Sequence, residues 1–402
     1  MSTQVVTASS VLASKPASHR LESIDLLRGL LMLLMALDHT RDFFSVPTGD
    51  PTDPLTSWPA LFATRWITHL CAPGFIALAG ISVYLQRQRG KSAEQMTRML
   101  VTRGVWLILL EVTVVSFAWA FSLSTYLQVI WAIGVSMICL GFLQRFSRAL
   151  VGAVGLSVLL LHNLLDPIRA ASFGNWALLW NMVHQPLLLR YHGGAIFVII
   201  YPVLPWSGVI LVGYVVGPLF CMAPQVRQRT AVLIGGLFLL VFSLLRIWHG
   251  YGDHRQFQHL ATPSRTVMSF LDVEKYPPSL HYILATFGVL LLIYALFDAI
   301  ATRGWLPRLR SFLQVYGCVP LFYYVLHLYL IHSAALLLSF HEHLDWRYFI
   351  RPLTPFTYMA GWGLSLPLVY CVWLGVILAL YLPCRWFGRL KARRRDWWLS
   401  YL

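Results

Sequence analysis

The sequence predicts an all-α protein: one polytopic membrane helix bundle of about ten transmembrane helices, with the N-terminus and the C-terminus cytoplasmic. Of its 402 residues, 58% are hydrophobic and only 12% are charged, about half the charged fraction of a soluble globular protein. Ten apolar segments are long enough to cross about 30 Å of hydrocarbon as helices. Lysine and arginine concentrate in every second connection between these segments, which is the pattern of cytoplasmic loops.

The expected spans follow one another without a repeat of fixed period or a separate soluble domain. We therefore expect a mobile cytoplasmic tail at residues 1–19 and a single transmembrane domain over residues 20–402. The spans are expected at residues 26–44, 61–85, 99–121, 127–143, 149–165, 195–220, 231–247, 279–300, 314–338 and 362–383.

The net charge of +15 is explained by the connections between the spans. Since no basic module stands apart from the membrane segments, we expect no nucleic acid partner. The six cysteines show neither a CxxC pair nor zinc-like spacing, so they are expected to be small buried hydrophobes, and no metal is expected. Most Lys and Arg lie before the first span or in the connections 86–103, 144–148, 221–230, 301–313 and 384–402.

The outer end of the first span carries charges that are unusual in a membrane helix. Asp38, Arg41 and Asp42 share one helical face, and His39 lies about 100° away. Ionisable groups in a membrane helix are costly unless they pair or face a wet cavity, so this group predicts a functional pocket. The alternative is that the span ends near Leu37 and that the charges cap it at the interface.

A second polar group lies at the cytoplasmic mouth of the same helix. Glu22, Asp25 and Arg28 follow each other at helical spacing, so they share one side of the first turns. The group either binds an anionic cofactor or anchors the helix at the membrane surface.

The second span places a polar stripe before a proline. Arg65, Thr68 and His69 are spaced i, i+3 and i+4, so they share a face. Pro73 follows one turn later and frees the carbonyl of His69 from its helical hydrogen bond. An interrupted helix beside ionisable side chains is typical of a site inside the membrane, whereas the plain alternative is a histidine used only for packing.

The ninth span repeats the combination of a proline with polar side chains. Pro320 is followed by Tyr323 and His327, which share a face, and by His332. These side chains either line a substrate path or fill the bundle. A histidine with a carboxylate neighbour is suited to general base catalysis, for example of acyl transfer. Proton-coupled transport uses the same residue types.

These motifs resemble the bacterial branch of the heparan-α-glucosaminide N-acetyltransferase catalytic-domain family, a transmembrane acyltransferase group. The resemblance runs from about Arg20 to the end of the chain. It implies transfer of an acetyl group from cytoplasmic acetyl-CoA to an amino sugar across the membrane. The motifs that carry it are "SIDLLRGLLMLLMALDHTRDFF", "TRWITHLCAPGFIALAG", "KYPPSLHYILATFG" and "GCVPLFYYVLHLYLIH".

The sequence departs from the family at one functional position. His39 corresponds to an active-site asparagine of the animal enzymes, and those enzymes have a functional histidine in the loop after the first span. The corresponding stretch here, "SVPTGDPTDPLTSWPALF", contains no histidine. This departure argues against an acetyl-histidine intermediate at that point, and it leaves both direct transfer in a ternary complex and an acyl-enzyme at another residue open.

The resemblance implies a catalytic group at the outer ends of the first two spans. His39 is expected to deprotonate the acceptor, oriented by Asp38 or Asp42. His69 is expected to be the second candidate base or a donor to the developing oxyanion. Acceptor or thioester oxygens are expected to bind Arg41 and Arg65, other substrate contacts are expected at Tyr323, His327 and His332, and CoA phosphates at Arg28, Arg87 and Arg89.

The predicted function is thus a membrane-embedded acyltransferase that moves an acetyl or similar group from a cytoplasmic CoA thioester to a sugar or lipid-linked acceptor at the outer face. The alternative is a proton-coupled transporter of a small solute, with His39 and His69 as proton carriers and the broken second and ninth spans as gates. Membrane lipid is an expected partner, a homo-oligomer is possible, and the expected location is the cytoplasmic (inner) membrane if the source is bacterial.

Overall fold

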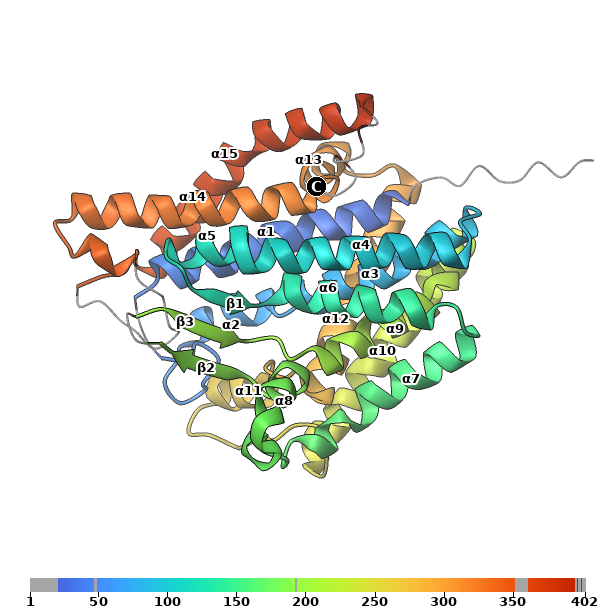
Figure 1. The fold of residues 1–402 in the computed structure, drawn as a ribbon, viewed down its shortest axis with the longest axis horizontal. Coiled ribbons are helices and arrows are strands. Elements are labelled where there is room, and N and C mark those ends of the chain that lie inside the picture. Colours follow the sequence, from blue (N-terminus) through green and yellow to red (C-terminus); the bar gives the residue numbers. More distant parts are fainter. Residues whose placement is uncertain are drawn as a thin grey trace, which may run out of the picture.

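The computed structural model describes residues 21–46, 49–191, 194–350, 361–394, 396 and 399. The tail predicted at residues 1–19 lies outside this part. The described chain forms a polytopic helical bundle with almost no strand, as predicted. In Figure 1 the long helices α1, α4 and α14 run roughly parallel. They comprise Glu22–Phe44, Ala93–Leu110 and Pro320–His341.

Ten helical segments of the described chain match the ten predicted spans. Eight are long and apolar enough to cross a membrane. The remaining two are α1, which carries six charged residues, and α6 (Val129–Leu143), which is shorter than the others. The eight are Pro59–Gln88, Ala93–Ala120, Arg148–Leu165, Val203–Cys221, Pro224–Trp248, Leu280–Arg303, Pro320–His341 and Leu366–Arg393.

Several of these segments are divided into shorter elements. The second span consists of α2 (Pro59–Thr68) and α3 (Cys71–Gln88), and a π-helical turn at Glu111–Val115 joins α4 to α5. The other helices and strands are α5 (Ser116–Ala120), β1 (Thr125–Leu127), α7 (Arg148–Leu161), α8 (Ala177–Val183), β2 (Leu187–Arg190), β3 (Ile196–Ile199), α9 (Val203–Val215), α10 (Pro224–Trp248), α11 (Pro263–Leu271), α12 (Leu280–Arg303), α13 (Pro307–Gly317) and α15 (Leu366–Arg393).

Helix α1 lies in the interior and contacts α3, α12, α13, α14 and α15. Its charges are therefore surrounded by protein, which removes most of the cost of placing them in lipid. The crossing with α13 brings the two backbones together. A Cβ atom at Gly29 would overlap the carbonyl oxygen of Leu313, and one at Gly317 would overlap that of Asp25. Small residues allow such close packing of membrane helices.

Helix α10 shows how the bundle faces lipid. Leu233, Leu237, Leu240 and Leu244 are each more than half exposed, and their spacing places them on one face. A continuous exposed leucine stripe is unfavourable in water but is expected against hydrocarbon chains. Together with the eight long apolar helices, this stripe is evidence of a multi-pass integral membrane protein.

A small sheet occupies one end of the bundle, at the left in Figure 1. β1 pairs in parallel with β3, and β2 pairs with β3 in antiparallel. The prediction of a continuous helical span over 195–220 was wrong at its start, because residues 196–199 form β3. The β-branched residues Ile196, Val198 and Ile199 suit a strand, and Pro202 separates it from α9 by fixing an extended backbone.

The boundaries of the last two spans also differ from the prediction. The ninth does not run continuously from residue 314, because α13 ends at Gly317 and α14 begins at Pro320. Proline is favoured at a first helical position, where its missing N–H is not needed. The last span begins at Leu366 and extends to Arg393, beyond the predicted end at residue 383. Its basic last turns therefore continue the helix.

Candidate active site

Asp38 connects the first two spans through an ion-pair network. Its carboxylate accepts hydrogen bonds from Arg65 Nη1 at 2.6 and 2.7 Å, from Arg41 Nη2 at 3.0 Å and from Thr68 Oγ1 at 2.9 Å. Arg41 also binds the half-exposed Asp42. As predicted, the charges of the two helices meet inside the bundle. Two arginines around one buried carboxylate make a stable, oriented group.

His39 does not use these carboxylates as its partner. Its Nδ1 lies 2.7 Å from Nε2 of His327 on α14, and the two rings stack with centroids 4.9 Å apart. Asp38 is engaged by arginine and threonine instead. The prediction that Asp38 or Asp42 orients His39 was therefore wrong, because His39 lies on a different side of α1 from these charges. The partner of His39 is a second histidine.

The hydrogen bonds of the histidine pair define which nitrogen of His39 is basic. His327 Nδ1 lies 3.0 Å from the carbonyl oxygen of Tyr323, which only accepts, so Nδ1 donates the proton. In a neutral ring His327 Nε2 is then an acceptor, and His39 Nδ1 donates to it. His39 Nε2 consequently carries the lone pair. In this arrangement Nε2 of His39 can accept a proton.

Aromatic rings enclose the histidine pair. Trp119 lies edge-on to His39 at 5.0 Å between ring centroids, and Tyr324 lies at 6.3 Å. Tyr323 stacks on His327 at 5.2 Å, which places this predicted substrate-binding residue behind His327. Such packing holds both imidazoles in one orientation and keeps bulk water away from them.

His332, the other predicted substrate contact on α14, belongs to the scaffold. Its Nδ1 lies 2.7 Å from the carbonyl oxygen of Ala118, and its Nε2 lies 2.7 Å from that of Phe349. Its ring also stacks on Phe121 at 3.9 Å. Both nitrogens of this buried ring face backbone oxygens. The ring therefore joins α14 to α5 and to the segment that follows α14. These backbone contacts leave neither ring nitrogen of His332 open to a substrate.

The second span is interrupted at His69, as its proline predicted. Helix α2 ends at Thr68 and α3 begins at Cys71. The carbonyl oxygen of His69 accepts a hydrogen bond from the hydroxyl of Tyr282 on α12 at 2.7 Å. The imidazole is buried against the Tyr282 ring at 5.3 Å, and its Nδ1 has no hydrogen-bond partner. His69 and His39 therefore contact different helices.

Two residues before α12 join this site and were not singled out from the sequence. Lys275 is buried, and its ammonium lies 5.1 Å from the ring centroid of Tyr276. Burial raises the pKa of Tyr276, but the positive charges of Lys275 and Arg65 outweigh it and lower this pKa below its ordinary value. The "KYPPSLHY" motif, which contains Lys275, Tyr276 and Tyr282, was the available signal.

A basic cavity of about 850 Å³ opens at the opposite end of α1 from His39. Arginine and lysine from α1, α3, α4 and α15 line it, in agreement with the predicted gathering of basic segments on one side. Leu21 and Ala392 also line it, so α1 begins and α15 ends at the same end of the bundle. The basic lining residues are Arg28, Arg89, Arg103, Arg385, Arg389 and Lys391.

A narrower, apolar cavity of about 270 Å³ continues into the bundle. It shares five lining residues with the basic cavity and extends past Met32 and Met35 to Tyr324, which contacts His39. On α1, residues 28, 32, 35 and 39 fall within about 60° of one another at 100° per residue. The face of α1 that lines both cavities is therefore the face that carries His39. The shared residues are Arg28, Ser82, Gln86, Arg103 and Pro320.

The predicted phosphate contacts separate in the structure. Arg28 and Arg89 line the basic cavity. Arg87 does not, because its guanidinium donates to the carbonyl and side-chain oxygens of Gln144 at 2.7 Å and so caps the end of α6. Residues 87 and 89 are about 200° apart on a helix, which explains why only one of them faces the cavity.

Among the residues that the structure describes, a cluster away from this site has the composition of a metal site. Ligand atoms of His162, Asp166 and His184 lie within 4.8 Å of one another. None of the three was a predicted site residue, and they come from the outer ends of α7 and α8.

Comparison with known proteins supports the resemblance seen in the sequence. The family model described as "Heparan-alpha-glucosaminide N-acetyltransferase, catalytic" matches residues 20–245. This range contains α1 and the interrupted second span. It also contains α4 and α6, which line the apolar cavity together with α1 and α3. No curated protein matches the chain.

Proposed function

This chain belongs to the heparan-α-glucosaminide N-acetyltransferase catalytic-domain family, and from that premise we propose that it moves an acetyl group from a CoA thioester to a sugar or lipid-linked acceptor across a membrane. The family indicates a membrane enzyme of the N-acetyltransferase type. One observation carries the more specific proposal: a basic mouth leads through an apolar cavity to the residue beside His39.

The basic cavity suits the nucleotide end of CoA. Its arginines come from four helices and face one volume of about 850 Å³. The phosphates of CoA carry several negative charges, and guanidinium groups bind phosphate oxygens in paired hydrogen bonds. By the positive-inside rule this end of the bundle faces the cytoplasm, where CoA thioesters are made. Acetyl-CoA therefore binds as the acyl donor at this end.

The apolar cavity suits the pantetheine arm that carries the thioester. Arg28 and His39 are 11 residues apart on α1, which is about 16 Å at 1.5 Å per residue. An extended pantetheine arm spans a distance of that order, and methionine side chains line this path. Flexible, polarisable methionines adapt to such a chain. The acyl carbon is thereby delivered toward the histidine pair.

His39 acts as the general base of the transfer. Its Nε2 takes a proton from the attacking amine or hydroxyl of the acceptor as the acceptor bonds to the thioester carbon. The carbon–sulfur bond then breaks, and protonated His39 gives the proton from Nε2 to the sulfur, so that CoA leaves as the free thiol and His39 is again neutral. His327 keeps His39 in the required tautomer throughout. This direct transfer uses no covalent enzyme intermediate.

The ion-pair network supports the outer end of the same site. Arg65 and Arg41 are held by Asp38, and we assign their fixed positive charge to the carbonyl oxygen of the thioester as it becomes negative. Preorganised charge of this kind lowers the barrier of acyl transfer. His69, with one nitrogen unpartnered, is the candidate contact for the acceptor.

The test uses purified protein in lipid vesicles, radiolabelled acetyl-CoA, and a lipid and sugar extract of the membrane as acceptor. We expect label to move into the extract and free CoA thiol to appear in equal amount. His39→Ala should lower the transfer rate by about 10²- to 10⁴-fold, the contribution of a general base. Binding of acetyl-CoA should be unchanged, because the basic cavity is intact.

The matched control is His341→Ala, which removes an exposed histidine from the same helix as His327. This variant should transfer acetyl groups at the wild-type rate. Thioester that stays intact with every acceptor fraction would overturn the proposal. Uptake of a solute driven by a pH gradient, without thioester consumption, would instead establish a transporter that uses the interrupted second and ninth spans.

A further inference from the structure

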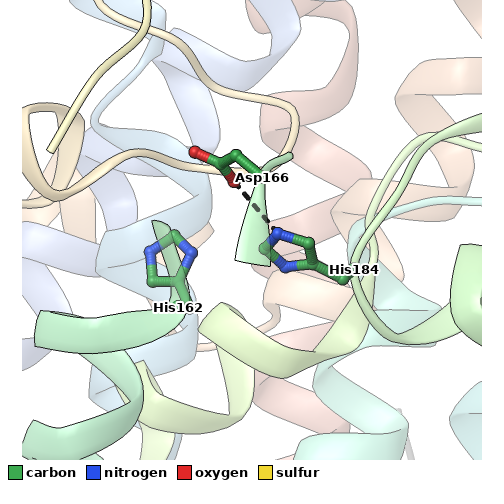
Figure 2. Close-up of side chains that lie close together, drawn as sticks. All are labelled: His162, Asp166 and His184. Carbon is green, nitrogen blue, oxygen red and sulfur yellow. Dashed lines mark hydrogen bonds and ion pairs between the residues drawn. The ribbon is translucent and has the colours of Figure 1, made fainter. Parts of the chain in front are cut away.

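Three potential metal ligands converge at the outer end of α7. His162 begins the 3₁₀ turn that follows α7, Asp166 ends this turn, and His184 caps the C-terminus of α8. One ligand atom from each lies within 4.8 Å of the other two. Figure 2 shows the two imidazole rings and the carboxyl group directed toward one another. The residues come from two separate elements, so the fold assembles this group.

The histidines of this cluster are buried with nitrogens that the protein does not satisfy. His162 is only 2% exposed, and neither of its ring nitrogens has a hydrogen-bond partner. His184 is equally buried, and its Nε2 faces Asp166. Buried polar atoms are nearly always paired, and an exception calls for an explanation such as an ion.

Asp166 is held in position to complete the group. Its Oδ1 lies 3.0 Å from His184 Nε2, and its Oδ2 accepts a hydrogen bond from Asn163 Nδ2 at 2.9 Å. Asn163 is itself fixed, because its Oδ1 accepts from the backbone N–H of Leu280. Partners that orient a ligand in this way are typical of built metal sites. The Asp166 side chain is 30% exposed, which gives an ion access from the outer side.

We propose that His162, Asp166 and His184 bind a zinc ion. Two imidazole nitrogens and one carboxylate oxygen favour zinc over calcium or magnesium, which prefer oxygen ligands. Bonds of about 2.0–2.2 Å place tetrahedral ligands roughly 3.4 Å apart. The Asp166–His184 separation of 3.0 Å is close to this value, and His162, whose ligand atom lies within 4.8 Å of the other two, closes the set by a movement of at most about 1.4 Å.

The ion leaves a fourth position for water on the exposed side of Asp166. It links α7 to the end of α8, directly before β2, and so fixes the segment that leads into the sheet. The site is independent of the acyltransferase proposal, because it shares no residue with either cavity.

The experiment measures bound metal on the intact protein. Tag-free protein is purified in detergent, stripped with EDTA, incubated with zinc chloride, separated from free metal by gel filtration and analysed for zinc by mass spectrometry. We expect about one zinc ion per chain. Cobalt loaded in its place should show the visible absorption of a four-coordinate site.

Two variants and a control decide the outcome. His162→Ala and the more conservative Asp166→Asn should each weaken zinc binding by about tenfold or more, whereas His254→Ala, which removes an exposed outer histidine, should not. Asp166→Asn keeps the side-chain volume at a partly exposed position, so it preserves the fold if His162→Ala does not. Wild-type protein that retains no zinc, or equal zinc in Asp166→Asn and wild type, would refute the site.

Discussion

Replacing His327 by phenylalanine tests whether the second histidine positions the first. The substitution preserves an aromatic ring on α14 but removes the acceptor of the 2.7 Å hydrogen bond from His39 Nδ1. His39 then holds a buried N–H without a partner and is free to adopt the other tautomer. A buried donor left unsatisfied costs about 1–3 kcal/mol. If this cost destabilises the His39 orientation that is needed for proton transfer, kcat should fall about 5- to 150-fold.

The assay is steady-state transfer of label from acetyl-CoA with the acceptor saturating. We expect a lower kcat and an unchanged KM for acetyl-CoA, since His327 lines neither cavity. His327→Gln should recover most of the rate, because its side-chain oxygen can accept the same hydrogen bond. A His327→Phe protein with the wild-type kcat, or one whose only change is in KM, would refute the assigned role.

Three further predictions address the mouth, the helix packing and a carboxyl group outside the membrane. Arg389→Glu should raise the KM for acetyl-CoA about five- to tenfold at low salt. The increase should be smaller at high salt, because salt screens exposed charges. Arg393→Glu, on the same helix but outside the cavity lining, should have little effect on this KM. Gly29→Ala should destabilise the protein by about 1–3 kcal/mol, measured by thermal unfolding, because the added methyl group meets the backbone of α13; Gly236→Ala, which meets open space, should not. Burial raises the pKa of Asp272 to about 6 despite the nearby charge of Arg255. The protonated carboxyl therefore stabilises the fold below pH 4, and this contribution is lost as the pH rises through about 6. Between pH 4 and pH 7 the unfolding temperature should fall less in Asp272→Asn than in wild type.

The sequence predicted the spans well because hydrophobic length is a local property. Arg28 was predicted at the cytoplasmic end of the first span, and it lines both cavities. The strand at Ile196–Ile199 was missed because a short apolar, β-branched run that leads into a helix has no distinct period. Its pairing with β1 depends on a segment about 70 residues earlier.

The partners of the site histidines could not be predicted in the same way. His39 meets His327 across 288 residues of sequence, and Asp38 was the plausible neighbour only because it is adjacent in the chain. Arg87 and Arg89 have the same chemistry, and only the rotation of α3 separates their roles. His162 and Asp166 have the i, i+4 spacing of a ligand pair, but His184 reaches them through a turn whose path the sequence does not specify.

Burial of α1 by α13, α14 and α15 also restricts the order in which the molecule can assemble. Helix α1 carries six charged residues, and the helices α13, α14 and α15 that cover it are synthesised after it. Until then its charges must be shielded by lipid headgroups, water or the insertion machinery. A truncation after α10 would remove the helices α12 to α15 that cover α1. Such a fragment should therefore be degraded even though its hydrophobic segments can insert. Quality control of this protein therefore depends on completion of its C-terminal third.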